Sequence, residues 1–110
     1  MSDITTHVLD LTRGAPAAGV RISLERASAT GAFADVSHGT TDAGGRWHAL
    51  GDATVGRYRL TFHVAEYFAR AGAECFFPEV LVVFDVTEPG RSHHVPLLLS
   101  PFGYSTYRGS

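Results

Sequence analysis

Residues 94–110 read HVPLLLSPFGYSTYRGS, and this stretch decides the predicted fold. An aliphatic run at 95–99 leads into the turn residues of 100–103, and a second run that contains tyrosine and threonine follows. Proline and glycine between two such runs indicate a β-hairpin. The end of the chain is therefore expected to be a strand, a turn and a second strand.

The same rhythm of short strands and turns extends over the rest of the 110 residues. Strands are predicted at 5–11, 20–25, 34–40, 46–50, 56–64, 79–86, 93–99 and 104–108, with clear turn signals at 13–16, 42–45, 88–90 and 100–103. The segment 65–71 consists mainly of helix formers and precedes Gly72, a residue that suits a helix end. About eight short strands and one short helix predict an all-β, two-sheet antiparallel sandwich, with a single domain over 1–110.

Composition excludes several classes of protein. Nine basic and eleven acidic side chains leave a net charge of −2, so no nucleic-acid partner is expected. No apolar run approaches the ~20 residues that cross a bilayer, and the first residues lack a signal-peptide pattern. The single cysteine, Cys75, excludes an intrachain disulfide. The expected location is the cytoplasm, with the peroxisome as the alternative in a eukaryote, and no membrane contact is predicted.

Period-two alternation sorts the histidines. In the first predicted strand His7 shares a face with Thr5. Near the other end of the chain His94 faces away from its neighbour His93, and both faces of that strand are largely apolar. One of these faces is expected to meet the core, and the other a partner subunit or a closed pocket. His94 is therefore a candidate for a confined polar site.

Arg46 opens the segment RWHAL after a Gly-Gly turn, where a solvated arginine at a strand end is the simpler interpretation. The ending Tyr107-Arg108-Gly109-Ser110 places an aromatic ring, a charge and a hydroxyl after an apolar hairpin that would hold them in place. A frayed polar tail is the alternative. No metal site is predicted, because the sequence has neither an HExxH motif nor paired cysteines.

Several motifs together resemble the 5-hydroxyisourate hydrolase family, the transthyretin-related proteins of purine catabolism. They are THVLD at 6–10, RGAPAAGV at 13–20, TTDAGGRW at 40–47, FFPEV at 76–80 and the stretch at 94–110. The resemblance runs from about residue 4 to 110, and the Tyr-Arg-Gly-Ser ending is its most specific element, since transthyretin hormone carriers lack it. The chain departs from the family where His93 replaces a frequent tyrosine and Gly44 a frequent aspartate. Neither departure removes a catalytic position.

The resemblance implies an eight-stranded transthyretin-like sandwich that assembles as a homotetramer, a dimer of dimers with active sites in an interface channel. It assigns catalytic roles to His7, Arg46 and His94. Substrate binding falls to His7 and Arg46 together with the last four residues, which are Tyr107, Arg108, Gly109 and Ser110. The family needs no metal and no organic cofactor.

The activity implied is hydrolysis of 5-hydroxyisourate to 2-oxo-4-hydroxy-4-carboxy-5-ureidoimidazoline in urate degradation. Water attack needs a base, a group that stabilises an oxyanion and a donor for the leaving nitrogen. His7 is favoured as the base over His94, although the sequence leaves that choice open, and Arg46 would stabilise the negative charge. The alternatives are a transthyretin-like binding protein for small ligands and a purely structural domain. Polar residues in the candidate channel disfavour a binding protein for small apolar ligands. A polar chain end that is held in place disfavours a purely structural domain.

Overall fold

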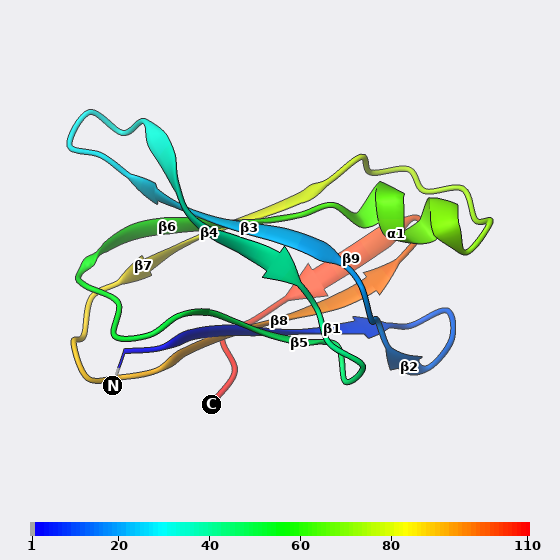
Figure 1. The fold of residues 1–110 in the computed structure, drawn as a ribbon, viewed down its shortest axis with the longest axis horizontal. Coiled ribbons are helices and arrows are strands. Elements are labelled where there is room, and N and C mark those ends of the chain that lie inside the picture. Colours follow the sequence, from blue (N-terminus) through cyan, green and yellow to red (C-terminus); the bar gives the residue numbers. More distant parts are fainter. Residues whose placement is uncertain (1) are drawn as a thin grey trace.

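The computed structural model describes residues 2–110, and its strands form two stacked layers with a short helix at one end (Figure 1). The elements are β1 (Ile4–Asp10), β2 (Ala15–Pro16), β3 (Arg21–Ala27), β4 (Phe33–Thr40), β5 (Arg46–Leu50), β6 (Gly56–Phe62), α1 (Val64–Arg70), β7 (Val80–Val86), β8 (His93–Ser100) and β9 (Gly103–Thr106). One layer is a five-stranded sheet in the order β2-β1-β8-β9, in which β5 also pairs with β1. The other is a four-stranded sheet in the order β4-β3-β6-β7. The predicted two-sheet sandwich is confirmed.

Alternating burial explains how the layers stack. In β1 every second residue, from Ile4 to Asp10, is buried, and the residues between them are half-buried. The inward side chains of both sheets interdigitate to form the core, as in other sandwiches. The largest fully buried side chains are Tyr58, Phe62, Ile4, Ile22, Leu24, Leu60, Leu97 and Leu99.

Pairing between β1 and β8 is parallel, in register from Ile4 opposite His93 to Asp10 opposite Leu99. The other ladders in residues 2–110 are antiparallel. Alternation of polar and apolar residues reveals which face a strand buries but not its direction, so the sequence pattern does not distinguish this pair. The parallel ladder places the two ends of the chain side by side in one sheet.

Local differences from the predicted elements lie at their boundaries. β6 ends at Phe62, and the predicted strand residue Val64 instead begins α1. The two-residue strand β2 falls within the predicted turn at 13–16, because that turn folds back onto the end of β1. β9 ends at Thr106, and Gly109 returns to the sheet through an isolated bridge to His94.

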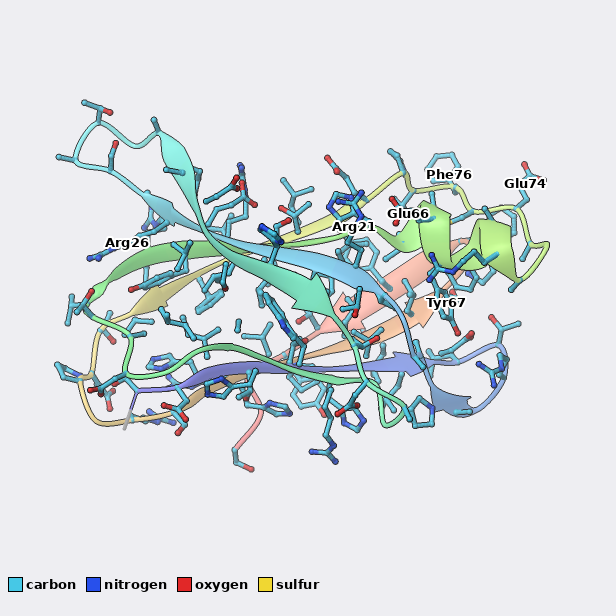
Figure 2. The ribbon with its side chains drawn as sticks, viewed as in Figure 1. Arg21, Arg26, Glu66, Tyr67, Glu74 and Phe76 are labelled. Carbon is cyan, nitrogen blue, oxygen red and sulfur yellow. The ribbon has the colours of Figure 1, made fainter. Side chains whose placement is uncertain are left out.

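Helix α1 closes one end of the sandwich. Gly72 adopts a φ of +72°, and its N–H donates to the carbonyl of Ala69, so it ends the helix as predicted. The hydroxyl of Tyr67 donates a hydrogen bond of 2.7 Å to Asp10 Oδ2 at the end of β1, and Figure 2 shows Tyr67 on the side of the helix that faces the five-stranded sheet. No helix in residues 2–110 is long and apolar enough to cross a membrane.

Candidate active site

Polar side chains form two rows across the outer face of the five-stranded sheet. In one row His48 of β5 lies opposite Thr5 of β1, and Thr5 lies opposite His94 of β8. In the next row Arg46 lies opposite His7. Residues two apart on a strand share a face, and paired residues on neighbouring strands lie side by side. The two-row site therefore consists of Thr5, His7, Arg46, His48 and His94.

The side chain and the backbone of His94 each have a hydrogen-bond partner. The ring Nδ1 and the Thr5 hydroxyl oxygen are hydrogen bonded at 2.8 Å. The N–H of Gly109 donates to the backbone carbonyl of His94, also at 2.8 Å. A Cβ at position 109 would lie only 2.5 Å from His94 Cδ2, so only glycine lets the tail pack this closely against the ring.

The electrostatic surroundings keep His94 neutral near pH 7. Burial lowers the pKa of His94 below its usual value of 6.5, and electrostatic interactions with the neighbouring His7 and Arg46 side chains lower it further. The guanidinium of Arg46 has no carboxylate partner among residues 2–110. The site thus collects groups that favour an external oxygen or negative charge.

His7 and Arg46 are both positioned by the turn before β5. His7 Nε2 donates a hydrogen bond of 2.8 Å to the carbonyl of Gly44, and because a carbonyl only accepts, Nδ1 carries the lone pair of the neutral ring. The Asp42 carboxylate accepts hydrogen bonds of 2.9 Å from the backbone N–H groups of Gly44 and Arg46. The hydrogen bond from His7 is to the backbone carbonyl of residue 44, so it does not depend on the side chain at that position.

A hollow of about 550 Å³ adjoins this face. Its wall is formed by Thr5, Thr6, Asp42, Arg46, Trp47, His48, Ser92, His94 and Ser110. Of the predicted site residues, the structure therefore brings Arg46, His94 and Ser110 together around one space. His7 lies in the neighbouring row and not in the wall itself.

Tyr107 and Arg108 line a separate, smaller cavity of about 140 Å³ beside His94. His93 borders the same cavity from inside the sandwich, and its side chain is 4% exposed, as expected for a residue against the core. Burial lowers the pKa of His93, and the charge of Arg108 lowers it further. The Arg108 guanidinium also donates to the carbonyl of Ser92 at 3.4 Å, and Ser92 is part of the wall of the hollow.

The residue that the sequence analysis did not select is His48. Its Nε2 lies 3.2 Å from Asp3 Oδ2, and it shares the wall of the hollow with His94. The signal was present in the alternation of RWHAL, which places His48 on the face of Arg46. No group of three or more histidine, cysteine, aspartate or glutamate side chains within residues 2–110 is arranged to hold a metal ion.

Comparison with known proteins identifies one family. The HIUase/Transthyretin family matches residues 4–109. The chain is 42% identical to a 5-hydroxyisourate hydrolase of Caulobacter vibrioides over the full length of both chains. It is 46% identical to the uric acid degradation bifunctional protein TTL of Arabidopsis thaliana, and that match covers 97% of this chain but only 37% of the plant protein.

Solved structures agree with the fold. The 5-hydroxyisourate hydrolase of Klebsiella pneumoniae has a TM-score of 0.86 and 38% identity, with 100% of this chain and 94% of that chain covered. Sea bream transthyretin in complex with thyroxine has a TM-score of 0.93 and 32% identity, with 96% and 93% covered. Backbone similarity alone therefore does not separate an enzyme from a carrier, and the side chains of the two-row site must do so.

Proposed function

Because the chain belongs to the HIUase/Transthyretin family, we propose that its two-row site hydrolyses 5-hydroxyisourate with His7, His94 and Arg46. The protein is an enzyme of the 5-hydroxyisourate hydrolase kind and acts in urate degradation. The observation that carries the assignment of residues is the grouping of His7, His94 and an arginine without a carboxylate partner in residues 2–110 on one outer face.

Water attacks an acyl carbon of the planar, polar ring system, and His7 is the base that removes its proton. The hydrogen bond from His7 Nε2 to Gly44 leaves the Nδ1 lone pair to accept that proton. The negative charge that develops on the acyl oxygen lies next to the Arg46 guanidinium, whose N–H groups stabilise it.

Ring opening then breaks the acyl C–N bond. The proton removed from water is passed to the leaving nitrogen, either by His7 itself or through His94, so that the step yields a carboxyl group and an N–H. Thr5 fixes the ring of His94, which supports a role in orienting the water or relaying the proton. No metal or organic cofactor takes part in this scheme.

The tail supplies the remaining contacts to the substrate. Ser110 borders the hollow directly, and Gly109 keeps the tail against His94. In the proposed complex Ser110 and Arg108 bind polar edges of the ring, and Tyr107 shapes the wall next to them. Tyr107 is 57% exposed in the single chain, which leaves room for it to contact substrate or a second subunit.

We also propose a homotetramer, a dimer of dimers in which outer faces of five-stranded sheets meet around the sites. On the outer face of β8, His94, Leu98 and Ser100 are only half-buried in the single chain, whereas Pro96 between them is buried. Leu98 shares this outer face with His94, so an apolar surface continues beyond the site. Light scattering that found a stable, fully active monomer would contradict a site in an interface channel.

A transthyretin-like carrier is the second candidate, favoured by the TM-score of 0.93 to sea bream transthyretin. An absorbance assay separates the two functions. Freshly generated 5-hydroxyisourate should lose its near-ultraviolet absorbance faster with the protein than without it, and much more slowly with His94→Ala than with the wild type. Wild-type protein that leaves the decay unchanged would favour the carrier.

A further inference from the structure

The pair formed by Asp3 and His48 has no role in the mechanism above, yet His48 borders the same hollow. His48 lies in one row with Thr5 and His94. Two strand spacings, roughly 10 Å, separate the backbones of His48 and His94. The two imidazoles therefore flank Thr5 from opposite sides, and both contribute to the wall of the hollow.

The contact with Asp3 determines which ring nitrogen of His48 carries the proton. Its Oδ2 lies 3.2 Å from His48 Nε2, and its Oδ1 accepts a hydrogen bond of 3.2 Å from the N–H of Asp52. These bonds lower the pKa of Asp3, so the carboxylate is ionised and can only accept. A neutral His48 must then carry its proton on Nε2, which leaves a lone pair on Nδ1. Nδ1 has no hydrogen-bond partner in the described part of the chain.

The backbone at Asp52 maintains this arrangement. Asp52 is the only residue other than glycine in the range 2–110 with a positive φ, at 56°. This conformation is uncommon outside glycine, although aspartate tolerates it better than most residues. It directs the Asp52 N–H to the carboxylate of Asp3, while the carbonyl of Asp3 accepts from the N–H of His93.

We propose that His48 is a substrate-binding residue, whose Nδ1 accepts a hydrogen bond from a ring N–H of 5-hydroxyisourate while Asp3 holds the imidazole in place. This inference rests on the proposed function. The substrate, an imide and urea, offers N–H donors at its edges, whereas Arg46 and Arg108 offer only donors themselves. His48 supplies an acceptor on the side of the hollow opposite His94.

A purely structural role for the pair of Asp3 and His48 predicts that replacing His48 lowers the melting temperature. The side chain of His48 is 57% exposed, and exposed ion pairs contribute little to stability. Replacing His48 should therefore leave the melting temperature nearly unchanged. The amide group of glutamine at position 48 lies about where Nε2 lies and can reproduce the contact with Asp3. The amide group of asparagine lies about where Nδ1 lies and can reproduce only the contact with substrate. The two substitutions thus separate the substrate contact from the ion pair.

The experiment measures kcat and KM at pH 8, where an ordinary histidine is neutral, for wild type, His48→Ala, His48→Asn, His48→Gln and Asp3→Asn. His48→Ala and His48→Gln should raise KM about three- to tenfold with kcat within about twofold, the scale of one lost hydrogen bond. His48→Asn should retain most of the affinity, and Asp3→Asn should raise KM by about two- to threefold. His38→Ala, an exposed strand histidine in the four-stranded sheet, is the matched control and should behave as wild type.

Equal KM values in all variants, or recovery by glutamine but not by asparagine, would overturn the role of His48. Turnover by the wild type tests the proposed function separately, because its absence contradicts hydrolysis whatever the His48 variants do. A titration with urate, a planar bicyclic analogue, provides a second measurement independent of turnover. Urate should shift the ¹⁵N signal of His48 Nδ1, and an unchanged signal at saturating urate would also overturn the contact.

Discussion

The outer faces of the two sheets carry similar side chains and use them differently. On the four-stranded sheet Arg57 lies 2.8 Å from Asp85, and Arg21 lies 2.7 Å from Glu66 of α1, a pair labelled in Figure 2. On the five-stranded sheet Arg46 has no carboxylate partner in residues 2–110 and lies near His94, whose pKa its charge lowers. Paired charges satisfy one another within the chain, whereas an arginine without a carboxylate partner is available to an external ligand.

The same contrast appears in how firmly the histidines are held. His94 is hydrogen bonded through its side chain to Thr5 and through its backbone to Gly109, and His7 is hydrogen bonded to Gly44. His38 of β4 is exposed and has no side-chain partner among the described residues. Fixed rings on a rigid sheet reduce the cost of ordering catalytic groups, which is the arrangement that a preorganised site requires.

The largest expected difference between the faces is in the effect of removing one arginine. Arg46→Ala should lower kcat/KM by about 10²-fold or more, because it removes the donors for the developing oxyanion. Arg21→Ala, which breaks the pair with Glu66 on the other face, should leave turnover within about twofold. Initial rates in the absorbance assay decide the comparison. Equal losses in the two variants would show that the faces do not differ in function.

A glycine comparison tests whether the tail positions His94. Gly109→Ala should lower kcat/KM about tenfold, since the added Cβ would lie 2.5 Å from His94 Cδ2 and displace the ring or the tail. The nearest atom that a Cβ at Gly103 would meet, Ser100 Oγ, is 3.8 Å away, so Gly103→Ala is the matched control and should retain turnover.

Circular dichroism would establish that both glycine variants are folded before their rates are compared. Wild-type turnover in a folded Gly109→Ala protein would mean that contact between tail and ring is dispensable. The last four residues would then be better described as a frayed polar tail.

The fold could be predicted from the sequence because the alternation of polar and apolar residues and the turn residues are local signals. β5 begins at Arg46 and ends at Leu50 as predicted, since the Asp42 turn and the strand pattern agree there. The parallel direction of β1 against β8 was beyond the pattern, because direction depends on the long connections between strands rather than on residue type. The strand β2 was missed because its pairing with β1 covers only two residues.

The site could be predicted only in part, because it also depends on how distant strands pair. Alternation placed His7 and His94 on defined faces, and the family resemblance selected them among the histidines. The register that puts His48 in the row of His94 is a tertiary property, which no spacing in the sequence encodes. Likewise, the separation of Tyr107 from Ser110 into two cavities follows from the bridge between Gly109 and His94, where the tail crosses the sheet.

A smaller effect concerns the titration of His94. Arg46→Gln should raise its pKa toward the ordinary value of 6.5, because one of the positive charges that disfavour protonation is removed. Burial is the larger cause of the lowered pKa and remains in the variant, so the recovery should be partial. NMR titration of the ring signals measures the change without any need for turnover. An unchanged or lower pKa would contradict electrostatic coupling between the rows.

The lowered pKa of His94 also fixes the sign of a pH effect on stability. The unfolded chain protonates this histidine at the ordinary value, whereas the folded chain does so at lower pH. The contribution of His94 is therefore fully present above about pH 6.5 and is lost as pH falls toward the folded pKa. Arg46→Gln should weaken this dependence, which thermal unfolding at several pH values would detect.

The smallest expected effect is on the paired face. Glu66→Gln removes the partner of Arg21, yet the two side chains are 45% and 51% exposed, so water screens the pair and readily replaces it. The melting temperature should change by no more than about 3 °C, and turnover should stay at the wild-type level. Adding salt should reduce even that change, because exposed pairs are screened within a Debye length. A large loss of turnover in Glu66→Gln would mean that the ion pairs of the four-stranded sheet influence the site through the core, and the division between the two faces would then fail.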